Sequence, residues 1–260
     1  SGKEAVVSRG ELVEIGGSFR MPDVMKMSQA VLREVGTTNK TRATDYEAAI
    51  DEQTAVLMKV HCSNYEIQGF SQSTSVEELV EIAERHKHVV VVDDIGSGAL
   101  YDYSQFGIQD EPLPSQSLQA GADVVLFSGD KLLGGPQCGI LIGKREALEK
   151  ISTHPMMRAL RLDKTILAAL SATLDLYLGP DPTQSVPILQ LISTPLEELQ
   201  TRAESLAESI SEIPDYTATA MEDVTYLGGG SVPTQEIETW SVSIKHALRS
   251  DDELSLQLRT

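Results

Sequence analysis

The sequence has few cysteines, few aromatic residues and no long apolar run. Its two cysteines, Cys62 and Cys138, stand far apart without metal-ligand spacing, which argues against a disulfide framework and against a zinc site. No segment approaches the roughly 18 consecutive apolar residues of a membrane-spanning helix, and the first ten residues lack the pattern of a signal peptide. We therefore expect no metal site, no membrane span and a cytoplasmic location.

Basic residues are also scarce, because 21 lysines and arginines face 39 acidic residues and leave a net charge of −18. A protein that binds nucleic acid usually presents a basic face that neutralises phosphates. No basic stripe is visible here. Any contact with RNA must therefore be local, or must involve a part of the protein outside this sequence.

Short β-rich runs alternate with helical patterns over the first two thirds of the chain, which predicts an α/β fold with a mainly parallel sheet. The expected strands are 5–9, 31–35, 54–60, 88–93, 123–127 and 139–143. Helical spacing marks 76–86, 163–178 and 194–213, and a linker is expected at 179–187. Alternating patterns at 238–244 and 253–258 predict strands of a small α+β domain. We expect a catalytic domain at 1–180 and a smaller domain at 181–260.

The segment FSGDKLLGGPQCG at 127–139 places Lys131 in a glycine-rich turn directly after an expected buried strand. Schiff-base chemistry needs an amine that can lose its proton, and partial burial favours the neutral amine. Ser128 can hydrogen-bond a cofactor phosphate, and the glycines allow the backbone to approach a flat ring. The alternative is a surface lysine in a loop.

Two further strand ends carry polar side chains. In VVVVDDIGSG at 89–98 an expected buried strand ends with two adjacent carboxylates and a flexible turn, and ligands bind at the carboxyl ends of parallel strands. An ionised aspartate keeps the ring nitrogen of pyridoxal phosphate protonated. Asp93 and Asp94 point to opposite sides, and we favour Asp94 because Asp93 is expected to finish the strand. Both aspartates can instead cap a turn.

In VHCSNY at 60–65, His61 can lie against the face of the ring, and Asn64 can donate a hydrogen bond to its phenolic oxygen. The alternative is an ordinary turn with a satisfied histidine.

Several long blocks resemble the bacterial selenocysteine synthase family, whose members are fold-type-I pyridoxal-phosphate-dependent transferases. The similar blocks are SRGELVEIGGSFRMPD (8–23), REVGTTNKT (33–41), KVHCSNYEIQGF (59–70), DIGSG (94–98), FSGDKLLGGPQCGILIGK (127–144) and HPMMRALRLDKTILAALSATLDLYL (154–178). The resemblance is dense over about residues 4–180, whereas GGGSVP at 228–233 and the final LQLRT resemble the family only faintly.

The resemblance implies a pyridoxal 5'-phosphate enzyme that converts seryl-tRNA(Sec) into selenocysteinyl-tRNA(Sec) with selenophosphate as donor, through an aminoacrylyl intermediate. It implies Lys131 as the cofactor lysine and as general base for the α-proton, and Arg158 and Arg161 as ligands of the anionic donor. It also implies a homodimer or larger homo-oligomer.

The resemblance begins inside the family's catalytic domain, so we expect the amino-terminal part that supplies the phosphate loop and binds RNA to be missing. Two alternatives remain beside selenium transfer. One is a related pyridoxal-phosphate-dependent lyase acting on a small amino acid or amino sugar, and the other is a non-catalytic fragment without the phosphate loop.

Overall fold

The computed structural model describes residues 2–15, 17–227 and 234–259. Its main sheet has six strands in the order β2-β1-β3-β4-β5-β6. The strands are β1 (Glu4–Ser8), β2 (Val31–Val35), β3 (Thr54–Val60), β4 (Val90–Gly96), β5 (Val124–Ser128) and β6 (Gly139–Gly143). The first five strands are parallel and β6 runs antiparallel to β5, which confirms the predicted α/β architecture.

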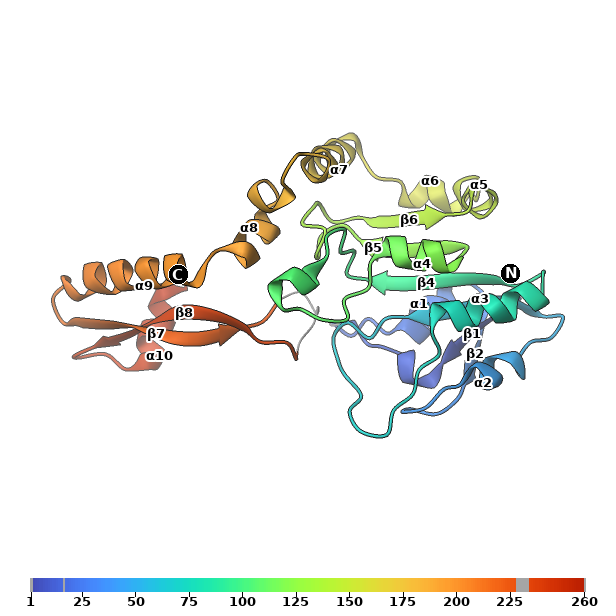
Figure 1. Ribbon diagram of the computed structural model, residues 1–260, viewed down its shortest axis with the longest axis horizontal. Coiled ribbons are helices and arrows are strands. Elements are labelled where there is room, and N and C mark those ends of the chain that lie inside the picture. Colours follow the sequence, from blue (N-terminus) through green and yellow to red (C-terminus); the bar gives the residue numbers. More distant parts are fainter. Residues whose placement is uncertain (1, 16, 228–233, 260) are drawn as a thin grey trace.

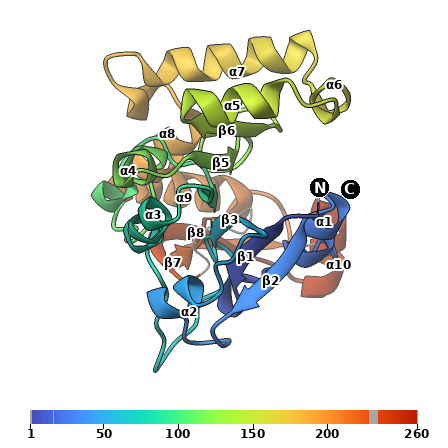
Figure 2. The ribbon, with the colours of Figure 1, turned by 90° about the vertical axis from the view of Figure 1, so that its right-hand side faces the viewer.

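Helices connect the parallel strands as crossovers and cover the sheet (Figures 1 and 2). The crossover helices are α1 (Met21–Met27), α2 (Ala43–Glu47), α3 (Val76–Arg85) and α4 (Pro114–Ala120), whereas α5 (Arg145–Ser152) and α6 (Met156–Leu160) follow β6. In the main core, Leu57 of β3 and Val125 of β5 are fully buried together with Leu79 of α3. Ser75 caps the start of α3: its hydroxyl accepts a hydrogen bond from the N–H of Glu78, and its own N–H donates to the Glu78 carboxylate, so the predicted crossover helix has a capping box.

The last third of the chain extends to one side of the main sheet (Figure 1). Helices α7 (Lys164–Tyr177) and α8 (Pro187–Ser193) lead to α9 (Leu196–Ser211), which packs on the antiparallel hairpin of β7 (Tyr216–Thr225) and β8 (Ile237–His246). The chain then forms α10 (Asp251–Leu258). The segment 228–233, with its faint family resemblance, lies outside the described residues.

One expectation for this part was wrong. The expected strand at 253–258 is helix α10, because Ser250 and Glu253 form a capping box and three acidic residues occupy the first helical turn. The segment 179–187, expected as a linker, lies between α7 and α8, with a 3₁₀ turn at Pro182–Gln184 and the first residue of α8 at Pro187. Within the described part of the chain, no helix has the length and apolar character needed to cross a membrane.

Candidate functional site

A cavity of about 230 Å³ lies at the carboxyl ends of β3, β4 and β5. Parallel strands bring their carboxyl ends to the same edge of the sheet, so residues far apart in sequence meet there. Four of the predicted site residues line this cavity, namely His61, Asn64, Asp94 and Lys131. The apolar remainder of the wall includes Val13 and Met21.

The loop that carries Lys131 is held firmly. The N–H of Leu132 donates to the carbonyl oxygen of Ser97 at 3.0 Å, and the Tyr103 hydroxyl donates to the Leu132 carbonyl at 2.8 Å. Leu132 is fully buried, so the residue after the lysine anchors the loop in the core. A methyl group added at Gly96 would lie 3.9 Å from Lys131 Nζ. It would also lie 4.0 Å from Asp94 Oδ1, so the absence of a side chain at Gly96 leaves room between the amine and the carboxylate.

The two adjacent aspartates face opposite sides of β4. Asp93 is buried and accepts a hydrogen bond from the Ser117 hydroxyl at 2.5 Å, whereas Asp94 lines the cavity with Lys131. The expectation that Asp93 ends the strand was wrong, since β4 continues to Gly96. Burial, followed by repulsion from Asp93, raises the pKa of Asp94 to about 6, although the Lys131 ammonium acts in the opposite direction.

His61 and Asn64 approach the cavity from the end of β3. Burial, together with the positive charges of Lys59 and Lys131, lowers the pKa of His61 to about 4, so its ring is neutral at physiological pH. The Asn64 side-chain nitrogen donates to the carbonyl oxygen of Glu14 at 2.8 Å, and its Oδ1 is buried with no hydrogen-bond partner among the described residues. Asn64 therefore uses one of its two N–H donors inside the protein, and its buried Oδ1 is left as an unpaired acceptor.

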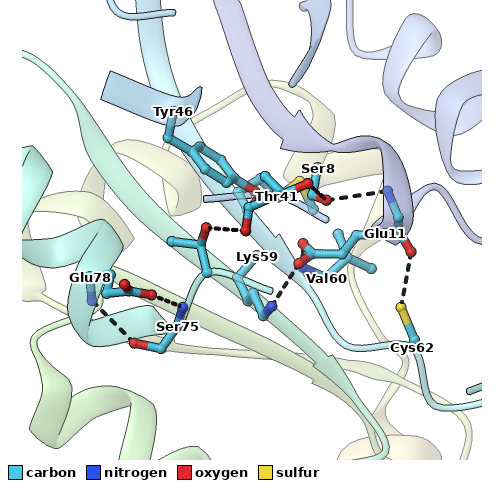
Figure 3. A network of polar contacts seen from close by, with 12 residues as sticks. Ser8, Glu11, Thr41, Tyr46, Lys59, Val60, Cys62, Ser75 and Glu78 are labelled. Carbon is cyan, nitrogen blue, oxygen red and sulfur yellow. Dashed lines mark hydrogen bonds and ion pairs between the residues drawn. The ribbon is translucent and has the colours of Figure 1, made fainter. Parts of the chain in front are cut away.

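A buried ion pair supports the strand end that precedes His61 (Figure 3). Glu11 is 4% exposed, and its carboxylate accepts hydrogen bonds from Lys59 Nζ at 2.6 Å and from the backbone N–H of Val60 at 3.0 Å. Beside it, the hydroxyls of Ser8 and Thr41 are hydrogen-bonded at 2.7 Å. Sequence reasoning did not single out this pair. Its signal is the one lysine inside the otherwise apolar run TAVLMKV.

Three predicted residues lie outside this cavity. Ser128 ends β5 and is paired with Gly139 of β6. Arg158 belongs to α6 and Arg161 follows it, and both side chains are exposed. Because β6 is antiparallel to β5, the chain returns to the opposite edge of the sheet before α5 and α6 begin (Figure 1). The structure thus brings four of the seven predicted site residues together around the cavity.

Similarity to solved structures defines the class of fold. D-glucosaminate-6-phosphate ammonia-lyase superposes with a TM-score of 0.65 at 22% identity, covering 99% of this chain and 60% of that one. The chain thus has the mainly parallel α/β architecture of the fold-type-I pyridoxal-phosphate enzymes, as predicted from the sequence.

Sequence comparison identifies the family. The family model described as "L-seryl-tRNA selenium transferase" matches residues 1–260, and the chain belongs to this family. Proteins named L-seryl-tRNA(Sec) selenium transferase are 49% identical over 259 residues in Hyphomonas neptunium and 47% identical over 260 residues in Alkaliphilus metalliredigens. Each alignment covers 99% of this chain but only 56% of the relative, so the chain spans little more than half the length of these relatives.

Proposed function

We propose that this chain takes part in the pyridoxal-phosphate-dependent conversion of seryl-tRNA(Sec) into selenocysteinyl-tRNA(Sec), with selenophosphate as the selenium donor. The observation that carries the proposal is the amine of Lys131 in one cavity with Asp94, in a chain of the L-seryl-tRNA selenium transferase family. We further propose that residues 1–180 form the catalytic part, that residues 181–260 form a smaller domain, and that the protein acts in the cytoplasm.

The residues around the cavity fit pyridoxal phosphate. The cofactor requires a lysine amine for the imine, a carboxylate to keep its ring nitrogen protonated, and a stretch of backbone without a side chain where its flat ring lies. Lys131, Asp94 and Gly96 supply these three features within one small space. The unpartnered Oδ1 of Asn64 is a further sign that the cavity receives a polar group, because buried polar atoms are rarely left unpaired.

Each side chain then has a defined task. Bound pyridoxal phosphate withdraws electrons from the α-carbon of an attached amino acid, which allows the α-proton and the β-substituent to leave. Lys131 would hold the cofactor and would accept the α-proton of the substrate. Asp94, with its pKa of about 6, is mostly ionised at neutral pH and holds a proton at the ring nitrogen. The neutral His61 ring would contact the cofactor without adding positive charge to the cavity.

Three proposed ligands need contacts beyond this cavity. Ser128 would hold the cofactor phosphate from the end of β5. Arg158 and Arg161 would bind the anionic selenium donor, because guanidinium groups form paired hydrogen bonds with phosphate-like oxygens. Both arginines lie outside the cavity of their own chain, and we propose that a second copy presents them to Lys131. We therefore also propose a homodimer or larger homo-oligomer.

The attachment site is tested by adding pyridoxal phosphate to the purified protein, reducing with borohydride and mapping the modified peptide by mass spectrometry. We expect the pyridoxyl group on Lys131, together with a visible absorbance band that Lys131→Ala abolishes. The matched control is Lys87→Ala, at an exposed lysine outside the cavity, which should keep the band. A band of unchanged intensity in Lys131→Ala would contradict the assignment.

The substrate is tested by comparing the binding and turnover of seryl-tRNA(Sec) with those of bulk seryl-tRNA. We expect selective binding of seryl-tRNA(Sec) and, with selenophosphate, a selenocysteinyl product. Turnover of a small amino acid or amino sugar without any response to seryl-tRNA(Sec) would instead identify a related lyase. A protein that retains pyridoxal phosphate but changes none of these substrates would refute the catalytic proposal for this chain.

A further inference from the structure

A second carboxyl group, that of Glu111, lies close to Lys131 but takes no part in the site described so far. It stands in the loop before α4 and is partly buried. Its Oε1 accepts a hydrogen bond from the Ser97 hydroxyl, whereas its Oε2 is shielded from solvent and has no partner among the described residues. Leaving a buried oxygen without a hydrogen-bond partner costs free energy, and this oxygen belongs to a carboxyl group within electrostatic reach of Lys131.

Glu111 is connected to the lysine loop through Ser97. Ser97 is fully buried, and its carbonyl oxygen accepts the hydrogen bond from the N–H of Leu132, the residue after Lys131. Burial raises the pKa of Glu111, while the Ser97 hydrogen bond and the Lys131 ammonium oppose the rise. The carboxyl group therefore holds its proton more tightly than an exposed glutamate, and it lies within electrostatic reach of the lysine amine.

Glu111 also lines a second cavity, of about 470 Å³, that adjoins the first. His61 and Ser63 line both cavities, so only these side chains need separate the Lys131 cavity from the one that Glu111 lines. Gln109 and Gln235 join two parts of the wall, since the Gln109 N–H donates to Gln235 Oε1 at 2.6 Å and Gln235 Nε2 donates to the Gln109 carbonyl at 2.7 Å. Because Oε2 is shielded from solvent, the Glu111 carboxyl group must turn about its side-chain bonds, the last of which has a broad energy profile, to present an oxygen to the cavity.

We propose that Glu111 is a catalytic residue that contacts the β-hydroxyl of the seryl group and supplies the proton with which this hydroxyl leaves as water. This inference rests on the proposed function, in which seryl-tRNA(Sec) loses water before selenium adds. Hydroxide is a poor leaving group, so a positioned acid accelerates its departure. In sequence, Glu111 appears only as one acidic residue of QDEPLP, a segment to which sequence reasoning assigned no role.

The step balances in protons and electrons. The α-carbon–hydrogen bond breaks, its proton passes to the Lys131 amine, and its electron pair forms the double bond between the α- and β-carbons. The β-carbon–oxygen bond breaks, and its electron pair stays on the oxygen. That oxygen takes the Glu111 proton and leaves as water, while Glu111 becomes a carboxylate. The Lys131 ammonium can then return a proton to the site.

The test compares two substrates that differ only in the leaving group. Glu111→Gln is assayed with seryl-tRNA(Sec) and with β-chloroalanyl-tRNA(Sec), whose chloride departs without a proton. Elimination is measured without a selenium donor, as the pyruvyl group formed by hydrolysis, and exchange of the α-proton with deuterated water is followed in parallel. The control is Glu84→Gln, at an exposed carboxylate on α3.

We expect Glu111→Gln to slow elimination from the seryl substrate by roughly 10²- to 10⁴-fold, the usual contribution of a general acid. Exchange of the α-proton and elimination of chloride should stay within a few fold of wild type. Glu111→Asp, which keeps an acid on a shorter side chain, should recover part of the seryl activity. Far-UV circular dichroism and pyridoxal phosphate absorbance establish that each variant is folded and loaded.

Equal loss with both substrates, or equal loss of α-proton exchange, would show a merely structural role and overturn the inference. Full seryl activity in Glu111→Gln would overturn it as well. A wild-type protein that acts on neither substrate would instead refute the proposed function, and the inference would fall with it. If Glu111→Gln does not fold, Glu111→Asp carries the same test, with the seryl substrate again expected to be the more impaired.

Discussion

Replacing Lys59 by methionine removes the cation from the buried pair beneath His61 while keeping a side chain of similar length. Burial raises the pKa of Glu11 above its usual 4.5, and the charge and hydrogen bond of Lys59 act to lower it. Without Lys59 the pKa rises further, and folding then favours the protonated carboxyl. A carboxyl with a raised folded-state pKa contributes stability that is present below the unfolded value and is lost as the pH rises.

The size of the effect follows from the same linkage. Glu11 can avoid a buried unpaired charge by taking up a proton. At pH 7, which lies 2.5 units above the usual pKa of 4.5, this proton uptake costs roughly 3 kcal/mol. At pH 5.5 the same cost is only about 1.4 kcal/mol. We therefore expect Lys59→Met to lower the free energy of unfolding by up to about 3 kcal/mol at pH 7. At pH 5.5 this loss of stability should be smaller by up to about 2 kcal/mol.

Urea unfolding followed by far-UV circular dichroism at both pH values measures this difference. The double variant Lys59→Met/Glu11→Gln, which has no buried charge at this pair, should recover much of the loss at pH 7. The control is Lys150→Met, because Lys150 pairs with Glu146 on the exposed face of α5 and should change stability by less than about 0.5 kcal/mol. A Lys59→Met penalty that is the same at both pH values would refute the reasoning.

Two further predictions concern the core and the turn after β4. Leu57→Ala should lower the free energy of unfolding by about 2–5 kcal/mol, because Leu57 is fully buried. The control Leu248→Ala, at an exposed position, should change it by less than about 0.5 kcal/mol, and urea titration measures both values. Gly98→Ala should destabilise by more than the roughly 1 kcal/mol expected from its positive φ, because the new methyl carbon would lie 2.6 Å from the Phe127 ring. Gly107→Ala, with a similar φ and open space, isolates the backbone cost, and an equal loss of thermal stability in both glycine variants would contradict this explanation.

The main sheet was predictable because its strands are short apolar runs bounded by polar turns. The runs at 54–60 and 139–143 have the same bounds as β3 and β6, and the run at 88–93 matches β4 less well because the strand continues through two aspartates. Charged residues at the end of an apolar run look like the start of a turn. Here they remain in the ladder, since Asp93 is satisfied by Ser117 and Asp94 opens into a cavity.

The error at 253–258 has a different cause. Leucines at every second position suggest a strand, but a capping box is a local signal that competes with this alternation. Ser250 accepts from the N–H of Glu253, and the Glu253 carboxylate accepts from the N–H of Ser250, which fixes the first helical turn. Leu254 is buried while Leu256 is exposed, so the alternating leucines do not share one face. The helix-start signal outweighs the period-two pattern in this segment.

The sequence predicts only those site residues whose positions follow from the order of the parallel strands. Parallel strands bring His61, Asp94 and Lys131 to one edge whatever their separation in sequence, so the order of polar strand ends predicts their meeting. Glu111 follows no strand, and its relation to Lys131 depends on the path of a loop and on the Ser97 hydroxyl. A loop path is set by tertiary packing rather than by local pattern, so the sequence did not point to Glu111. The acid that we propose for this chemistry therefore comes from a loop, whose position strand order does not determine.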